Sequence, residues 1–274
     1  MPELPEVESI VNRLRNGSQD IPSLIGMRIR GAQVYWQRSL VIPSLEEFSR
    51  RIVNQFIRSI ERRGKFLVFR LSEDVLLIHL RMSGDLILTH STHLEHNHLR
   101  MAIDFDNDYH LYFIDPRKFG RVWLVNQAHQ VVGDLGPEPL DPKFTPTKFY
   151  QSLQTYQRRI KPLLMDQTFI AGLGNIYADE ALFRAGIHPL TISSQLSLQQ
   201  AEELLKAIQE VLLEGIERNG ASIDWVYRGG EFQNHFAVYH RSGEACYRCG
   251  TKIAKITVGQ RSTHYCPNCQ KQLG

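Results

Sequence analysis

The chain has 274 residues, with 32 lysines and arginines against 29 acidic residues and a net charge of +3. A chain of this length exceeds the usual size of one domain and can bury a sizeable core, whereas its nearly balanced charge does not by itself indicate a nucleic-acid partner. No stretch approaches the ~18 consecutive apolar residues of a membrane span, and the opening sequence MPELPEVESI is acidic rather than a basic, apolar leader. We therefore expect a cytoplasmic protein that does not enter the membrane.

The first predicted element is a helix from about Pro5 to Arg15. Proline suits the start of a helix, and the pair Asn16-Gly17 suits its end. The apolar residues in between recur at helical spacing, at Val7, Ile10, Val11 and Leu14.

Short β-branched and aromatic runs follow from Gln55 to Val125, among them FLVFRL, VLLIHL and HLYFID. Gly, Asp and Asn separate these runs, and the pattern predicts a β-sandwich. The stretch GPEPLDPKFTPT, from Gly136 to Thr147, holds four prolines and no apolar periodicity, as is typical of a linker between domains.

The chain becomes helical beyond this linker. Ser197 and Gln200 form a capping-box pattern that predicts the start of a long helix. One apolar stripe then follows, made of Ala201, Leu204, Leu205, Ile208, Val211, Leu212 and Ile216. We predict a sandwich domain over residues 1–135, a linker over 136–148, a helical domain over 149–239 and a separate terminal module over 240–274.

All four cysteines lie in that terminal module, in two Cys-x2-Cys pairs: Cys246, Cys249, Cys266 and Cys269. This spacing predicts one zinc ion held by four thiolates, and the alternative of two disulfides does not suit a cytoplasmic chain. Four thiolates close the coordination shell of zinc, so the metal would be structural and would have no open position for a substrate.

The module is also strongly basic. From residue 240 to 274 the chain holds six lysines and arginines against one glutamate, a net charge of 6 − 1 = +5. Between the cysteine pairs the run TKIAKITVGQRSTHY predicts a two-stranded hairpin with its turn near Gly259, presenting Gln260 and Arg261. An arginine at this tip suits a phosphate contact, although the residue alone is equally compatible with a solvated surface charge.

Six motifs occur in order along the chain: MPELPEVES at the start, RRGKFL at 62–67, HLRMSG at 79–84, DPRKFG at 115–120, AGLGNIYADEALFRAGIHP at 171–189, and the four-cysteine finger. Together they closely resemble the formamidopyrimidine-DNA glycosylase family over essentially the whole chain. The resemblance implies an α+β multidomain fold, with an N-terminal helix and β-sandwich, a helix–two-turn–helix domain and a zinc-finger hairpin. It also implies a monomeric base excision repair enzyme that acts on double-stranded DNA containing oxidised bases or abasic sites. Such an enzyme removes oxidised purines, namely formamidopyrimidines and 8-oxoguanine, through a Schiff base on Pro2 and cleaves the backbone by β,δ-elimination.

The resemblance assigns catalytic roles to five residues. Once Met1 is removed, Pro2 offers a secondary amine to attack the sugar; an α-amino group titrates near pH ~8 against ~10.4 for lysine, so far more of it is neutral. Glu3 would be the general acid, and Glu6 would position the amine, unless it serves only the helix dipole. Lys65 would assist β-elimination near a phosphate, and Arg261 would bind a phosphate and assist δ-elimination.

Five further residues are implied as DNA contacts. An enzyme that rotates a base out of a duplex must fill the gap, and apolar wedges and arginine are the usual fillers. Met82, Arg117 and Phe119 match these positions, and Arg117 would contact the orphaned cytosine. Asn175 is predicted to cap the helix that follows GLGN, whose free amides suit a phosphate. His96 matches a DNA contact in a segment, HNH, that departs from the usual HDH.

Two further departures and two rival functions accompany this interpretation. The segment from Gly220 to Cys246 is shorter than the common family form, so selectivity among lesions is open. The family usually has a basic phosphate contact shortly before Ile160. This chain lacks it at the matching position, and Arg158 or Arg159 could take its place. The rivals are an endonuclease VIII-like enzyme for oxidised pyrimidines, which Leu4 in place of the typical glycine disfavours, and a DNA-binding zinc protein without catalysis.

Overall fold

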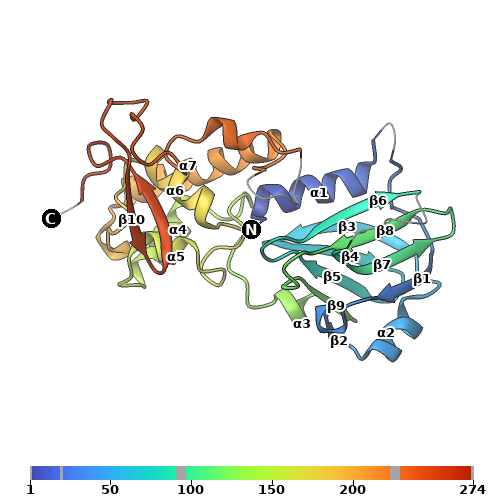
Figure 1. The fold of residues 1–274 in the computed structure, drawn as a ribbon. Coiled ribbons are helices and arrows are strands. Elements are labelled where there is room, and N and C mark those ends of the chain that lie inside the picture. The colour runs from blue at the N-terminus through green and yellow to red at the C-terminus, as the bar shows by residue number, and fades with distance from the viewer. Residues whose placement is uncertain (1, 19–20, 91–96, 223–228, 273–274) are drawn as a thin grey trace. The chain divides into compact units, whose positions relative to one another are not determined.

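The structure is a computed structural model that describes residues 2–18, 21–90, 97–222 and 229–272 (Figure 1). The chain divides into two compact units. The first contains Met1–Asp134 with Ser222–Gly230, and the second contains Leu135–Ala221 with Glu231–Gly274. None of the helices in the described ranges has the length and hydrophobicity that a membrane span requires.

The first unit begins with helix α1, Leu4–Asn16, close to the predicted bounds. Glu3 occupies its N-cap position and forms a reciprocal capping box with Glu6. At the other end the chain leaves the helix at Gly17, where φ is +71° and a Cβ would lie 2.6 Å from the carbonyl oxygen of Ile21. Only glycine fits that turn without strain.

Two β-sheets form the predicted sandwich in the described part of the first unit. One sheet has the order β1-β7-β8-β6, with bounds Ile29–Val34, Leu99–Phe105, His110–Ile114 and Asp85–Thr89. The other has the order β2-β9-β5-β4-β3, with bounds Leu40–Ile42, Arg121–Val125, Val75–His79, Phe66–Leu71 and Ile57–Arg63. All pairings are antiparallel except that of β2 with β9. Short helices α2, Leu45–Ile52, and α3, His129–Val132, complete the unit.

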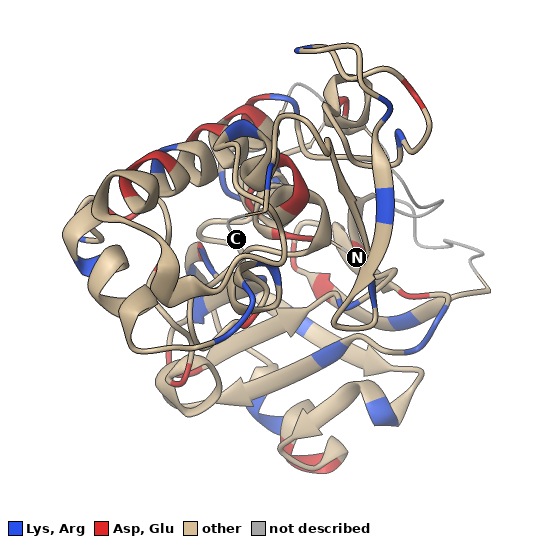
Figure 2. Ribbon diagram, turned by 90° about the vertical axis from the view of Figure 1, so that its left-hand side faces the viewer, with Lys and Arg blue, Asp and Glu red and all other residues tan. Residues whose placement is uncertain are grey.

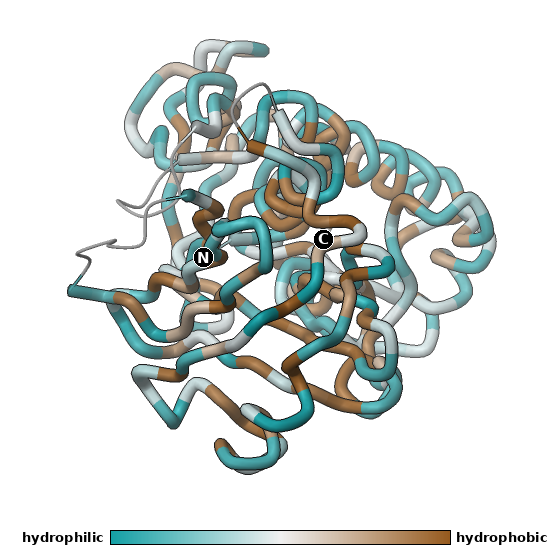
Figure 3. Tube along the Cα trace, turned by 90° about the vertical axis from the view of Figure 1, so that its right-hand side faces the viewer, coloured by the Kyte–Doolittle hydropathy of each residue, from teal (hydrophilic) through white to brown (hydrophobic). Residues whose placement is uncertain are grey.

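The core of this unit joins α1 to both sheets. Apolar residues recur along the strands of the sandwich, as the brown segments of Figure 3 show. The apolar face of α1 packs into the same cluster of buried residues as strand side chains such as Phe69, Ile78 and Phe113. The helix that follows the predicted nucleophile is therefore anchored to the sandwich by hydrophobic burial.

The second unit is helical and includes the finger. Its helices are α4, α5, α6 and α7, over Pro146–Gln154, Ile160–Leu164, Asn175–Arg184 and Leu198–Glu217. Helix α7 begins at the predicted capping box of Ser197 and Gln200. The hairpin of β10, Ala254–Val258, and β11, Arg261–Tyr265, follows. Phe183 of α6 packs with Val238, Ile253 and the buried Cys246 and Cys266, so α6 contributes to the small core of the finger.

The stretch predicted as a linker is packed against this unit. Gly136 donates its N–H to the carbonyl of Gln167 at 2.8 Å, and a Cβ there would lie 2.6 Å from backbone atoms of Phe169. Its last residues already belong to α4, because Thr145 caps that helix and Pro146 suits its first position. The four prolines therefore mark a packed connection rather than an extended one.

Candidate functional site

The N-terminal residues lie in a buried, hydrogen-bonded arrangement. Pro2 is buried, and Glu3 and Glu6 are each 2 % exposed. The backbone N–H of Glu3 donates to Oε2 of Glu6 at 2.7 Å. Because that nitrogen belongs to the peptide bond between Pro2 and Glu3, Glu6 fixes the residue that carries the predicted nucleophile. Glu6 thus acts on this segment through a hydrogen bond, beyond any effect of the helix dipole.

Lys65 lies in the two-residue turn between β3 and β4, after Gly64 at a φ of +56°. Its exposure is 4 %, which is rare for a lysine and excludes the alternative of a solvated strand edge. Arg62 ties the turn to α1, since its Nε donates to Oε2 of Glu8 at 2.7 Å. This ion pair joins the element that carries Lys65 to the helix that follows Pro2.

One buried carboxylate connects the two predicted wedge loops. Asp115 is 1 % exposed, and its Oδ1 accepts hydrogen bonds from the hydroxyl of Ser83 at 2.6 Å and the N–H of Arg117 at 3.1 Å. Its Oδ2 accepts the N–H of Gly120 at 2.7 Å. Asp115 therefore holds both ends of its own loop and also the turn that follows Met82.

The residues at the tips of these loops are exposed, as DNA contacts require. Phe119 is 46 % exposed, Met82 is partly exposed, and Arg117 places its guanidinium carbon 5.1 Å from the centroid of the Phe119 ring. Arg121 also stabilises the loop, because its Nη1 donates to the carbonyls of Lys118, Phe119 and Gly120 at 2.9 to 3.3 Å. The motif forms a preshaped surface loop and does not bury Phe119 in the core.

His79 is a residue that the sequence motifs did not single out. Its Nδ1 accepts the N–H of Arg81 at 2.9 Å, at the positive-φ residue that opens the Met82 turn. Burial lowers the pKa of His79 to about 3, and the charges of Arg81 and Lys65 act in the same direction. His79 is therefore a neutral acceptor near pH 7. His96 lies outside the described residues.

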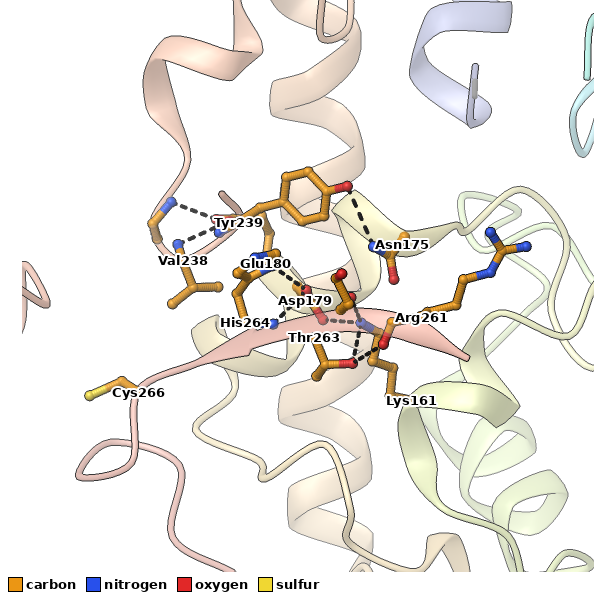
Figure 4. Close-up of polar contacts among 12 residues, drawn as sticks. Lys161, Asn175, Asp179, Glu180, Val238, Tyr239, Arg261, Thr263, His264 and Cys266 are labelled. Atoms are coloured by element: carbon orange, nitrogen blue, oxygen red, sulfur yellow. Dashed lines mark hydrogen bonds and ion pairs between the residues drawn. The ribbon is translucent and has the colours of Figure 1, made fainter. Parts of the chain in front are cut away.

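The structure corrects the role predicted for Asn175. Gly174 is the N-cap of α6, because its extended backbone, with φ −135° and ψ −153°, suits that position, and Asn175 is the first helical residue. Asn175 Nδ2 instead donates to the hydroxyl of Tyr239 at 3.4 Å (Figure 4). The first backbone amides of α6 thus lie beside an asparagine and a tyrosine hydroxyl.

The four cysteines have the geometry of a metal site. Their sulfur atoms all lie within 4.8 Å of one another. Cys246 and Cys269 are 3.9 Å apart, and Cys249 and Cys266 are 3.5 Å apart. Tetrahedral coordination at ~2.3 Å places sulfurs ~3.8 Å apart, whereas a disulfide needs ~2.05 Å. The arrangement fits zinc and not two disulfides.

The tip of the finger is a tight hairpin turn. Val258 pairs with Arg261, and the two residues between them, Gly259 and Gln260, have φ values of +56° and +62°. Such a turn matches the twist of a two-stranded hairpin and needs a glycine or a similarly tolerant residue. Arg261 is exposed directly after it.

A cavity of about 220 Å³ lies beneath this tip. Arg261 lines it together with Gly259, Pro162 and Arg158. Arg158 also pairs with Asp166, at 2.8 Å between Nη1 and Oδ2. Arg158 and Arg159 are the two candidates for the basic contact that is missing before Ile160. Of these, Arg158 lines the same cavity as Arg261.

Charge is unevenly distributed within the second unit. The exposed side of α7 is mainly acidic (Figure 2), with Glu202, Glu203, Glu210 and Glu217 around Lys206. The hairpin and the residues around it carry the excess positive charge noted in the sequence. A polyanion is therefore favoured at the finger and disfavoured along α7.

Comparisons with known proteins match almost the whole chain. Family models match three segments: the formamidopyrimidine-DNA glycosylase N-terminal domain over residues 1–122, the H2TH domain of the same enzymes over 135–226, and a zinc finger found in FPG and IleRS over 243–272. The formamidopyrimidine-DNA glycosylase of Chloroflexus aurantiacus is 45 % identical over 278 residues, 98 % of each chain. That of Protochlamydia amoebophila is 40 % identical over 281 residues, 99 % of this chain and all of its own. The chain belongs to the formamidopyrimidine-DNA glycosylase family.

Solved structures of family members share the whole fold. A complex of Lactococcus lactis Fpg with abasic-site DNA superposes with a TM-score of 0.91 at 34 % identity, covering 98 % of this chain and all of that one. MutM bound to DNA containing carbocyclic 8-oxo-G gives 0.90 at 35 % identity, covering 99 % and 100 %. As a member of this family the chain is a DNA glycosylase of base excision repair.

Proposed function

We propose that the chain excises oxidised purines, namely formamidopyrimidines and 8-oxoguanine, and then cleaves the DNA backbone as an abasic-site lyase. The observation that carries this proposal is the buried arrangement of Pro2, Glu3 and Glu6 at the start of α1. A secondary amine beside a carboxylate, fixed by a second carboxylate, has the components that nucleophilic catalysis at a sugar carbon needs.

In the first step, the Pro2 nitrogen that is freed by removal of Met1 attacks the sugar C1′. The bond from C1′ to the base breaks and the base leaves with a proton. Glu3 protonates the opening sugar ring, and the nitrogen lone pair then forms an iminium with C1′. Glu6 keeps the attacking residue in place through the Glu3 N–H.

In the second step, the iminium makes the C2′ protons acidic. Loss of one of them expels the 3′ phosphate by β-elimination, and a further elimination expels the 5′ phosphate. Lys65, nearly buried at a rigid turn, is the proposed participant in the first elimination. Arg261 is the proposed phosphate contact that favours the second.

The remaining residues would hold the DNA. Met82 and Phe119 would fill the space left by the rotated nucleotide, and Arg117 would donate to the orphaned cytosine. Asn175, together with the amides at the start of α6, would contact a phosphate. The contact assigned to His96 rests on the resemblance alone.

We also propose one structural zinc, a monomeric state and a cytoplasmic location. Cys246, Cys249, Cys266 and Cys269 would hold the metal, which fixes the fold of the finger and supplies no step of the chemistry. Analytical ultracentrifugation with metal analysis would give the mass and the zinc content of the particle.

Borohydride trapping on damaged duplex DNA tests the proposed chemistry. We expect a covalent adduct whose intact mass and peptide map place it on Pro2, and we expect none from a chain with one extra residue ahead of Pro2. An adduct on an internal lysine would refute the assignment of the nucleophile. A chain that binds damaged DNA without any adduct would instead be the catalytically silent zinc protein.

Substrate class is tested with the same assay. Lactococcus lactis Fpg has also been crystallised with DNA containing an oxidised pyrimidine, so duplexes with oxidised purines and oxidised pyrimidines should be compared side by side. We expect faster excision of the purines. Faster excision of the pyrimidines would favour the endonuclease VIII-like alternative.

A further inference from the structure

A fully buried ion pair lies between the helices of the second unit and the finger. Lys161 of α5 is 0 % exposed, and its Nζ lies 2.6 Å from Oδ1 of Asp179 on α6. The same Nζ donates to the carbonyl of Ser262 at 2.9 Å and to the hydroxyl of Thr263 at 2.8 Å (Figure 4). The pair therefore binds directly to strand β11.

The second oxygen of the carboxylate binds the next residue of the strand. Asp179 Oδ2 accepts the backbone N–H of His264 at 2.9 Å, and Nδ1 of the same histidine lies 3.3 Å away. Lys161 and Asp179 together thus contact three consecutive residues of β11, Ser262, Thr263 and His264. Arg261 immediately precedes them.

A hydrogen-bonded path leads from the ion pair to Arg261 itself. The hydroxyl of Thr263, which accepts from Lys161, donates to the carbonyl of Arg261 at 3.2 Å. On the opposite side of the tip, a Cβ built on Gly259 would lie 3.4 Å from the ring of Pro162, the residue after Lys161. Helix α5 therefore supports both sides of the turn that presents Arg261.

Helix α6 links this support to the other proposed phosphate contact. Asp179 lies one turn after Asn175, so the two side chains share a face of the helix. The adjacent Glu180 accepts the backbone N–H groups of residues 237–239 at 2.8 to 2.9 Å. That segment ends at Tyr239, whose hydroxyl accepts from Asn175.

Stability alone does not account for such a pair. Removing two charges from water costs about as much as their attraction returns, and a well-packed apolar pair often stabilises a protein equally well. An ion pair with directed hydrogen bonds does impose one geometry on its neighbours. We propose that Lys161 and Asp179 are positioning residues that fix Arg261 relative to Asn175, so that both can bind the DNA backbone together. This inference rests on the proposed phosphate contacts of Arg261 and Asn175.

The test uses the zinc-loaded, full-length chain. Lys161→Met/Asp179→Leu replaces the pair with apolar side chains and leaves no unpaired charge, and Thr263→Val removes only the hydroxyl link to Arg261. Arg261→Gln is the reference, and Glu214→Gln is the control, because it breaks an ion pair of α6 with α7 that does not involve the hairpin. Zinc content and circular dichroism establish that each variant is folded.

Two readouts distinguish positioning from a general structural role. The first is the dependence of DNA affinity on salt, whose slope decreases by about 0.9 for each phosphate that the protein no longer neutralises. The second is the fraction of δ-elimination product from DNA with a preformed abasic site. We expect the pair variant and Arg261→Gln to lower both to a similar extent, and their combination to add little. Glu214→Gln should leave both at wild-type values.

A folded pair variant with a wild-type slope and product ratio would overturn the inference, and so would losses that add fully to those of Arg261→Gln. If the pair variant does not fold, Thr263→Val decides by the same criteria. Failure of the wild type to form a trapped adduct would refute the proposed function instead, while the salt slope would still report on Arg261.

Discussion

Asp85 is a buried carboxyl group whose protonation makes the stability of the protein depend on pH. It lies at the start of β6, is 7 % exposed, and has Arg13 of α1 at 3.9 Å from its Oδ1. Burial raises the pKa of Asp85 to about 6, and the charge of Arg13 compensates only in part. The folded state therefore binds the proton more tightly than the unfolded state, where the pKa is ~3.9.

We predict that Asp85 makes the protein less stable as pH rises from about 4 to about 6. Below this range the carboxyl is neutral in both states, and above it the buried charge costs up to about 3 kcal/mol, from ~1.4 kcal/mol per pKa unit. Urea unfolding of the wild type and Asp85→Asn at pH 4 and pH 7.5 measures this. The variant should gain stability relative to the wild type at the higher pH. A difference that does not change with pH would contradict the pKa shift.

Asp115 is a functional residue that the sequence motifs did not reveal. The motif DPRKFG directed attention to Arg117 and Phe119, whose chemistry suits DNA, and Asp115 received no role. Asp115 is important because it accepts a hydrogen bond from Ser83, 32 residues earlier, and because its side chain is only 1 % exposed. The motif itself indicates neither the partner nor the burial. In the same way, Asn175 was predicted as a cap because asparagine favours that position, but the extended backbone of Gly174 takes it.

At the scale of elements, Asp115 leads to a prediction about two loops. Ser83→Ala removes two hydrogen bonds that join the Met82 turn to the DPRKFG loop, one from the Ser83 hydroxyl to Asp115 and one from the Arg117 N–H to that hydroxyl. It leaves the bonds of Asp115 to Arg117 and Gly120 intact. We expect a loss of about 1 kcal/mol in stability, as for a typical buried hydrogen bond. We also expect a reduced preference for cytosine opposite the lesion, because Arg117 and Met82 are no longer held together.

Excision from duplexes with cytosine or adenine opposite the lesion measures this preference. Thr89→Ser, an alteration at the far end of β6, serves as the matched control. An unchanged cytosine preference in a Ser83→Ala chain of lower stability would show that the link supports only folding.

The finger is the element whose fold we expect to depend most on the proposed zinc. Its buried residues form a small cluster that includes Cys246 and Cys266, so loss of the metal would remove both the cross-link and part of the core. We predict that Cys249→Ser lowers zinc content and DNA affinity by at least tenfold while the sandwich remains folded. Tyr247→Ser, at a neighbouring residue that is 75 % exposed, is the control. Normal DNA cleavage by a zinc-free chain would contradict a structural role for the metal.

Elements were predictable from sequence where one pattern dominated. Helix α7 has a capping box and a continuous apolar stripe, and both appear as predicted. Strand β1 was missed because IRGAQV has large apolar residues only at its ends, with Ile29 as its one fully buried residue. Its pairing with β7 is a tertiary effect that no local pattern encodes.

At the scale of the whole molecule, the family resemblance predicted the fold and the order of its parts, whereas the connections between parts were harder to predict. The segment from Gly136 to Thr147 has the composition of a linker, yet it packs on the helical unit and contributes to α4. The finger, predicted as a separate terminal module, matches a family model of its own over residues 243–272, and its buried residues also pack against Phe183 of α6. Composition describes a segment alone, whereas packing depends on its neighbours, so neither contact could be predicted from the sequence.

Selectivity among lesions is a property of the whole molecule rather than of one element. A rotated base is discriminated by hydrogen bonds to its edge and by the wall that closes over it. The sequence resemblance predicts that the segment from Gly220 to Cys246 is shorter than the common family form, and residues 223–228 within it lie outside the described part of the chain. A shorter wall weakens the penalty for a base that lacks the expected groups. Ring-opened formamidopyrimidines pair less well than 8-oxoguanine, so rotating them out of the duplex costs less and depends less on that wall.

We therefore expect formamidopyrimidine to be excised at least as fast as 8-oxoguanine opposite cytosine. Adenine opposite the lesion should slow excision, because the Arg117 guanidinium donates two hydrogen bonds to the acceptors of cytosine but meets a donor on adenine. Single-turnover excision on four duplexes, with each lesion opposite each base, measures both effects, and Arg117→Gln is the matching variant. A strong preference for 8-oxoguanine would mean that residues between Gly220 and Cys246 rebuild the wall despite their length. Equal rates opposite adenine and cytosine would show that Arg117 does not recognise the base opposite the lesion.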